Sequence, residues 1–300
     1  LSIRRQRQMC IRDRMGVFRD HVSTGPATTE SLRSCLRKLR EGGAVEVHER
    51  VDLRAWSRLR VGGTGDLLVR CRTATAVGSV LDALACHGVS WLVIGGGTAL
   101  VLPDAGLRVP LLRLSGELAS FEMDLDGVVA GAGAPLEQVE RAACRSGLAG
   151  LEAHRSPGSL GGALRAEATS GRGGLMRRVE WVDVLRPGEE VRRLWPRRTP
   201  RPLMDGSAAE ARAVLLAARI SLQPSRPSAV ASSRGSGSGE RSPAARGGVR
   251  IFRDPEGGGA SELLRQAGCE MVTIGGARTD PADPNHLLTT RLASAADVAG

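Results

Sequence analysis

The sequence predicts an α+β protein, and three observations support this fold class. Short apolar segments of β character alternate irregularly with amphipathic helical segments, beginning in the order β, β, α, β, β. Several of these β segments end in glycine clusters, which are typical of tight turns. A stretch rich in Ser, Gly, Pro and Arg sets a small final unit apart, and 300 residues suffice for one large domain or two ordinary ones.

The first third of the chain reads as a helix followed by mixed structure. Apolar periodicity predicts a helix over residues 30–40, with a threonine placed to cap it. From Val51 the character changes to β, and residues 59–70 predict a strand, a glycine turn and a second strand. Apolar residues at helical spacing predict another helix over residues 75–87.

The most informative segment is an apolar β-run from Trp91 to Ile94 that ends in Gly95, Gly96 and Gly97. Glycine lets the backbone approach a ligand closely because it has no Cβ atom. A strand that feeds such a turn exposes N–H groups, which can hold a pyrophosphate as backbone anion nests do. The segment lacks the spacing of a Rossmann fingerprint and the lysine of a P-loop, and a tight hairpin turn is the structural alternative.

The remaining elements are shorter and are separated by turn signals and a linker. A proline at the first turn favours a helix start, and dense Ser, Gly and Pro favour a linker. In chain order we expect a strand and turn over 127–133, a helix over 135–146, a glycine cluster over 156–163, strands over 179–185 and 213–222, a linker over 223–248, a strand from Val249, a turn at Asp254-Pro255, a helix over 260–266 and a strand around Val272.

Composition argues against a nucleic-acid partner despite a net charge of +10. Lys38 is the only lysine, tyrosine is absent and Asn285 is the only asparagine, a pattern typical of GC-biased coding. Aromatic residues make up 2% of the chain, which leaves few platforms for stacking bases. No apolar run approaches the roughly 18–20 residues that span a bilayer, so we expect no membrane partner.

The distribution of cysteine and histidine favours a reduced, metal-free protein. The six cysteines are scattered without a CxxC pair, and the five histidines lie far apart, so we expect cytoplasmic localisation and no metal site. Residues 1–14 are basic but lack the apolar core of a secretory signal. We expect them to be a non-native leader joined upstream of Met15.

Three elements occur in a specific order: a turn at Gly95-Gly-Gly-Thr-Ala-Leu-Val101, a turn at Pro157-Gly-Ser-Leu-Gly-Gly-Ala163, and a final module with Ile251-Phe-Arg-Asp-Pro255 and Ile274-Gly-Gly-Ala277. In this order and spacing the chain resembles the UDP-N-acetylenolpyruvoylglucosamine reductase (UDP-N-acetylmuramate dehydrogenase) family. The resemblance implies a vanillyl-alcohol-oxidase-type FAD-binding domain of two α+β halves, over residues 15–222. It also implies a small substrate-binding domain over residues 249–300, which we expect to be truncated.

The resemblance implies FAD and NADPH as cofactors and UDP-N-acetylglucosamine enolpyruvate as a small-molecule substrate. In that family NADPH reduces FAD, and the flavin passes hydride to the enol ether during peptidoglycan precursor synthesis. A serine protonates the resulting carbanion, while an arginine and a glutamate stabilise the intermediate. We expect a monomer with neither nucleic acid nor membrane as its partner.

The cofactor contacts that the resemblance implies fall on the two glycine turns, which would close around one coenzyme. Gly62 and Gly63 would shape the entry turn, between the two strands expected over residues 59–70. The cofactor-binding residues carried over are Gly95, Gly96, Gly97, Thr98, Ala99 and Leu100 in the first turn, and Pro157, Gly158, Ser159, Gly161 and Gly162 in the second.

Several positions depart from the family pattern. Arg250 stands at the position of the proton-donating serine, and arginine stays protonated at any working pH, which makes it a poor proton donor. Ser242 could substitute only if its loop were rearranged. Arg198 and Arg201 are both candidates for the family's catalytic arginine. Other departures are Ala99 and Glu167, each where the family has asparagine, Arg155-Ser156 where it has Gly-Ile, and Asp283-Pro-Asn-His286 where it has His-Ala-Asn-Phe.

The family's glutamate would lie beyond Gly300, so we expect it to be missing from this sequence. The sequence therefore predicts FAD-dependent, NADPH-consuming reduction of the enolpyruvyl sugar nucleotide, with Arg198 and Arg250 at catalytic positions. The alternative hypothesis is a non-catalytic relative that binds flavin or UDP-sugar, or a damaged reading frame, because the serine proton donor is lacking.

Overall fold

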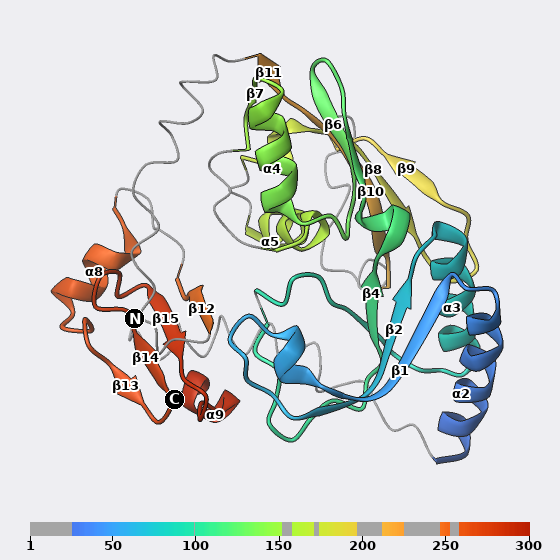
Figure 1. Cartoon of the computed structure of the whole chain (residues 1–300), viewed down its shortest axis with the longest axis horizontal. Coiled ribbons are helices and arrows are strands. Elements are labelled where there is room, and N and C mark those ends of the chain that lie inside the picture. The colour runs from blue at the N-terminus through green and yellow to red at the C-terminus, as the bar shows by residue number, and fades with distance from the viewer. Residues whose placement is uncertain are drawn as a thin grey trace.

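The structure is a computed structural model that describes residues 26–98, 100–151, 158–170, 174–196, 212–224, 247–252 and 258–300. The described elements form three units along the chain, each built on its own main sheet (Figure 1). The fold class is α+β, as the sequence predicts. Within the described ranges, no helix combines the length and the apolar character needed to cross a membrane.

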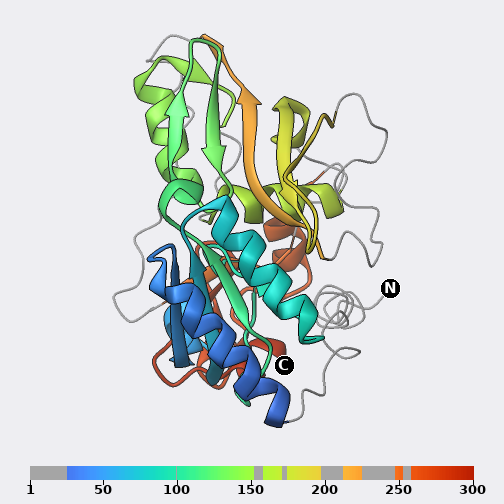
Figure 2. The ribbon, with the colours of Figure 1, turned by 90° about the vertical axis from the view of Figure 1, so that its right-hand side faces the viewer.

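The first unit contains α2 (Pro26–Glu41), β1 (Val45–Asp52), β2 (Thr64–Cys71), α3 (Ala74–Cys86), β3 (Leu92–Val93) and β4 (Leu111–Leu114). The sheet order is β1-β2-β4-β3; β1 is antiparallel to β2, and the other neighbours are parallel. Figure 1 and Figure 2 show α2 and α3 side by side against one face. Since successive strand residues point to opposite faces, Leu112 joins the core under these helices and Leu111 a smaller core on the other face.

In its described residues, the second unit is an antiparallel sheet with two α-helices. Its sheet order is β5 (Phe121–Met123), β6 (Gly127–Gly131), β10 (Val214–Ser221), β8 (Val179–Leu185) and β9 (Arg192–Leu194), and the other elements are α4 (Leu136–Arg145), α5 (Leu160–Ser170) and the small pair of β7 (Leu148–Ala149) and β11 (Gln223–Pro224). Leu185 and Leu216 join the core of α3, so this helix packs between the first two units.

As far as the structure describes it, the third unit is a four-stranded antiparallel sheet with two short helices. Its sheet order is β12 (Gly247–Arg250), β15 (His286–Thr289), β14 (Ala277–Thr279) and β13 (Thr273–Ile274), and its helices are α8 (Ala260–Gln266) and α9 (Ala295–Ala299). The Thr289 hydroxyl donates to the Leu59 carbonyl at 2.6 Å. The Asp104 carboxylate accepts from the N–H groups of Ala295 and Ala296 at 2.8 and 3.1 Å. These bonds fasten the third unit to the first.

One predicted strand is wrong: residues 59–63 form no strand. The Arg60 N–H donates to Ser57 O at 3.1 Å and Arg60 has a φ of 56°, so the chain turns at this point. Leu59 and Val61 are buried among residues of the third unit instead of lining a sheet. Docking of the third unit therefore overrides the β pattern of this segment.

Candidate functional site

The glycine turn after β3 lies directly against the glycine turn before α5. A Cβ atom added at Gly95 would lie 2.1 Å from the Ser159 Oγ atom, and one added at Gly96 would lie 2.7 Å from the Gly158 Cα atom. Real Cβ atoms essentially never lie this close to another heavy atom. The two turns are therefore in contact, and their small residues are required for that contact.

The two turns carry backbone donors that have no acceptor among the described residues. Within the described part of the chain, the following N–H groups donate no hydrogen bond: those of Gly95, Gly96, Gly97, Thr98, Gly158 and Ser159. Gly97 and Ser159 are buried, and buried backbone N–H groups nearly always have a partner. A concave row of such donors binds anions. The arrangement can therefore hold a diphosphate.

The N-terminus of α5 does not serve as this anion site, because its donors are already used. The Ser159 side chain caps the helix, and the preceding segment pairs with residues near β6. The bonds are Leu160 N–H to Ala134 O at 2.9 Å, Gly161 N–H to Ala132 O at 2.8 Å, and Gly162 N–H to Ser159 Oγ at 3.2 Å. An anion would therefore be bound by the turns and not by the helix end.

Two donors from neighbouring segments hold the first glycine turn in place. Arg113 of β4 donates from Nη1 to Gly95 O at 2.9 Å, and the Arg58 N–H donates to Gly97 O at 3.0 Å. The Arg113 guanidinium also lies over the Trp56 ring, 4.8 Å from its centroid. The turn is thus anchored through its carbonyl groups, which leaves its N–H groups available.

Arg113 places positive charge beside these donors. Burial, together with the like charge of Arg70, lowers the pKa of Arg113 below its ordinary value, although arginine remains protonated in proteins. In the described ranges no carboxylate forms an ion pair with Arg113. The charge of this site therefore favours an anionic ligand.

The other predicted cofactor residues lie in or near the two turns, with some outside the described residues. Ala99, Pro157 and Arg198 are outside them, as is Arg201. Leu100 packs against the small core beneath the first turn. Gly161 and Gly162 begin α5. Gly62 and Gly63 pack against the segment from Leu102 to Gly106, which follows the first turn, and not against the turn itself.

Arg250 lies at the end of β12, where its Cα is paired with that of His286 in β15. Its side chain is 56% exposed, and its Nε lies 4.0 Å from the Asp283 Oδ2 atom. The Arg58 Nε donates to the carbonyl of Gly248 in the same strand at 3.4 Å. Because the Arg58 N–H also binds Gly97, one residue connects the strand of Arg250 with the first glycine turn.

Comparison with known proteins supports a flavin site. A family model described as an FAD binding domain matches residues 65–194, a range that includes both glycine turns. The UDP-N-acetylenolpyruvoylglucosamine reductase of Acidiphilium cryptum is 30% identical over 246 residues, which cover 80% of this chain and 79% of that protein. The enzyme of Paramagnetospirillum magneticum is 32% identical over 249 residues, which cover 80% of this chain and 79% of that protein. The chain belongs to the UDP-N-acetylenolpyruvoylglucosamine reductase family.

A solved structure of this reductase family has the same fold. The crystal structure of UDP-N-acetylenolpyruvylglucosamine reductase from Thermus caldophilus aligns with a TM-score of 0.65 at 24% identity, covering 85% of this chain and 92% of that one. The predicted vanillyl-alcohol-oxidase-type class, with an FAD-binding domain of two α+β halves, is thereby confirmed. The unpartnered donors of the two turns fit the diphosphate of FAD.

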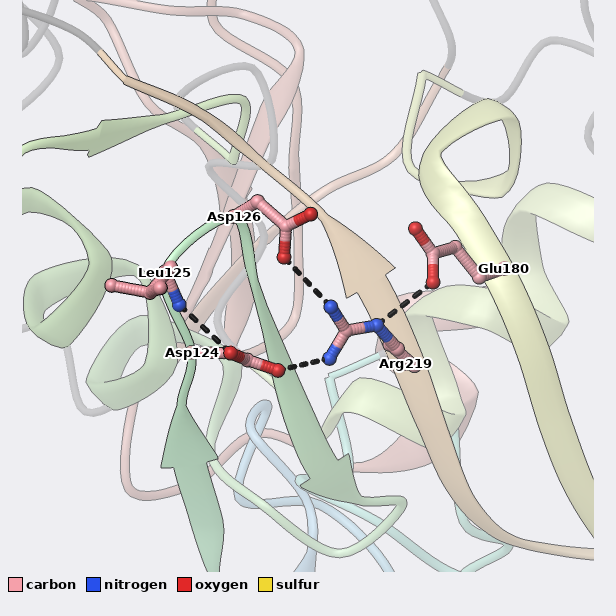
Figure 3. Close-up of polar contacts among 5 residues, drawn as sticks. All are labelled: Asp124, Leu125, Asp126, Glu180 and Arg219. Carbon is pink, nitrogen blue, oxygen red and sulfur yellow. Dashed lines mark hydrogen bonds and ion pairs between the residues drawn. The ribbon is translucent and has the colours of Figure 1, made fainter.

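A separate ionic cluster joins β8 and β10 of the second unit to the turn between β5 and β6 (Figure 3). Arg219 of β10 binds Asp124, Asp126 at 2.7 Å and Glu180 at 2.8 Å. The hydrogen bond from Arg219 holds the pKa of Asp124 below its ordinary value of 3.8. All three carboxylates accept from the single Arg219 guanidinium, which ties the segments that carry them together, so we assign the cluster a structural role. Among the described residues no group of His, Cys, Asp and Glu side chains could hold a metal ion.

Sequence reasoning missed the residues that anchor the first turn, Arg113 and Trp56. A signal was available for Arg113, because it is the single charged residue in the otherwise apolar segment Leu111-Leu-Arg-Leu114. A charged side chain within a buried strand needs a specific partner. No comparable signal marked Trp56, whose role depends on contacts between segments distant in sequence.

Proposed function

We propose that this chain binds FAD and reduces UDP-N-acetylglucosamine enolpyruvate to UDP-N-acetylmuramate, with NADPH as reductant, in peptidoglycan precursor synthesis. The observation that carries the proposal is the set of N–H groups on two contacting turns that find no acceptor in the described part of the chain. Both turns lie within the range that matches an FAD binding domain. The substrate is taken from the names of relatives that align over most of their length. We further propose a cytoplasmic monomer.

We assign the chain's residues to binding and to proton handling. Bound FAD would supply the hydride-transfer chemistry. The N–H groups of Gly95–Thr98 and of Gly158-Ser159 would bind its diphosphate, with Arg113 contributing positive charge. Residues 15–222 would form the FAD-binding domain and residues 249–300 the substrate-binding domain, joined by the linker over 223–248.

Proton transfer is the step in which this chain differs from the family pattern. A general acid must hold a proton that it can release at the working pH. Arg250 stands at the serine position, and its guanidinium does not release its proton. We therefore propose that flavin is reduced normally by NADPH while the sugar nucleotide is turned over slowly. The second candidate, a non-catalytic flavin- or UDP-sugar-binding protein, is favoured by the same residue.

Flavin binding is the first experiment. Purified protein is mixed with FAD, freed of unbound ligand and examined for the visible flavin absorbance band. Retention of the band supports the FAD proposal. Protein that retains no flavin would remove both the reductase and the flavin-binding alternative.

Turnover separates the two candidates. Stopped-flow mixing with NADPH should bleach the flavin, and enolpyruvyl-UDP-N-acetylglucosamine should then restore the colour slowly. Arg250→Ser should speed that second phase, by roughly tenfold or more given the usual contribution of a general acid. Arg291→Ser, which changes an exposed arginine of the same unit, is the matched control. Fast reoxidation of the unmodified protein would contradict the role assigned to position 250.

A further inference from the structure

The conformation of the first glycine turn is fixed from one side by a side chain that lies outside both turns. Arg113 donates to Gly95 O, and its guanidinium is held over the Trp56 ring. In a trans peptide unit the carbonyl group and the following N–H point in opposite directions. The bond to Gly95 O therefore turns the N–H of Gly96 away from Arg113.

The strand register explains why Arg113 reaches the turn. Residues two apart in a strand share a face of the sheet, so Arg113 lies on the same face as Leu111. Leu111 belongs to the small core that also contains Ile94, the residue immediately before the turn. Arg113 is thus directed beneath Gly95 by its place in β4.

The surroundings of the Arg113 guanidinium are unfavourable for a cation unless an anion binds nearby. Burial lowers the Arg113 pKa, and so does the like charge of Arg70, its register partner on β2. Arg70 has its own partner in Glu46, at 2.7 Å. Arg113 has no carboxylate partner among the described residues and spends its hydrogen bond on a carbonyl group.

We propose that Arg113 is a positioning residue of the diphosphate site, which orients the Gly96 N–H toward the ligand by holding the Gly95 carbonyl. The inference rests on the proposed FAD binding, and it holds that the Arg113 side chain fixes the conformation of the first glycine turn. Trp56 supports it by restricting the guanidinium to one plane.

The test measures FAD affinity by quenching of flavin fluorescence, at low salt and at about 1 M salt, where the Debye length is about 3 Å. Arg113→Met removes the donor and the charge, whereas Arg113→Lys keeps a donor of nearly the same reach. Arg70→Met is the matched control, because it removes a neighbouring charge without a bond to the turn. The melting temperature of each ligand-free variant reports whether it is folded.

We expect Arg113→Met to weaken FAD binding about tenfold or more, equivalent to the loss of one good charge-assisted hydrogen bond. Most of the loss should persist at high salt, since salt screens the charge of Arg113 but not the orientation of a peptide group. Arg113→Lys should bind FAD at least threefold more tightly than Arg113→Met. The FAD affinity of Arg70→Met should stay within about twofold of that of the unmodified protein.

Three results would overturn the inference. The first is an FAD affinity of Arg113→Met within about twofold of that of the unmodified protein. The second is a loss of affinity in Arg113→Met that vanishes at high salt, and the third is an FAD affinity of Arg113→Lys as low as that of Arg113→Met. Should Arg113→Met fail to fold, the comparison of Arg113→Lys with Arg70→Met at high salt decides the matter. Unmodified protein that binds no FAD would instead refute the proposed function, and this inference with it.

Discussion

Replacing Gly97 with alanine should destabilise the fold and weaken flavin binding together. Gly97 has a φ of 65°, which lies in the left-handed region. An added Cβ atom would lie 2.0 Å from the Trp56 carbonyl oxygen and 2.9 Å from its carbonyl carbon. Backbone cannot yield as a flexible side chain does, so the turn itself must move.

The magnitude can be built from three contributions. A left-handed conformation costs an alanine about 1–2 kcal/mol. Displacement of the turn breaks the hydrogen bond from the Arg58 N–H to Gly97 O, at a cost of about 1 kcal/mol. Overpacking against Trp56 adds about 1–3 kcal/mol. We therefore expect Gly97→Ala to lower the free energy of unfolding by at least about 3 kcal/mol.

Gly88→Ala is the matched control, because it isolates the conformational cost. Gly88 has a φ of 63° and nothing within 4 Å of its added Cβ atom. It should lose only about 1–2 kcal/mol and bind FAD normally. Urea unfolding followed by circular dichroism gives the stabilities, and flavin fluorescence gives the affinities. A Gly97→Ala protein that is no less stable than Gly88→Ala would contradict this prediction. So would a Gly97→Ala protein that binds FAD as tightly as the unmodified protein.

Three further predictions follow from contacts outside the turns. Because Arg219 depresses the pKa of Asp124, their stabilising effect is present above the ordinary value of 3.8 and is lost as pH falls through the lower folded value. Arg219→Met should therefore melt at a lower temperature than the unmodified protein at neutral pH, and the gap should narrow below about pH 4; a gap independent of pH would contradict this. Asp104→Ala removes a carboxylate that accepts from the first two N–H groups of α9, beside the helix's own Ser294 cap, and should cost about 1 kcal/mol. Amide hydrogen exchange in the last fifteen residues of the chain (286–300) should become faster, and unchanged exchange there would count against this prediction. Burial raises the pKa of Cys71 to about 12, so alkylation of the native protein should modify the exposed Cys86 and spare Cys71, and equal labelling by peptide mass mapping would refute the assignment.

Elements with a clear apolar stripe could be predicted from the sequence. The helix over 260–266 and the strand over 179–185 have the bounds that were expected, because the apolar residues of each segment mark its buried positions. β4 could not be predicted in this way, since four residues are too few for periodicity and its central place depends on pairing with β2. α5 was missed because two glycines near its start lower helix propensity, and its first turn is fixed by contacts with distant residues.

At the site, too, local sequence was insufficient, because it left a hairpin turn as the alternative to a ligand-binding turn. A hairpin joins antiparallel strands and would leave the glycines as part of a closed two-stranded unit. Instead β3 is parallel to its neighbour β4, so the glycine turn opens a crossover connection. The crossover provides no facing strand to accept from Gly95–Thr98, and in the described residues nothing else does. Sheet topology, which no local pattern encodes, is therefore what turns a glycine cluster into a row of available donors.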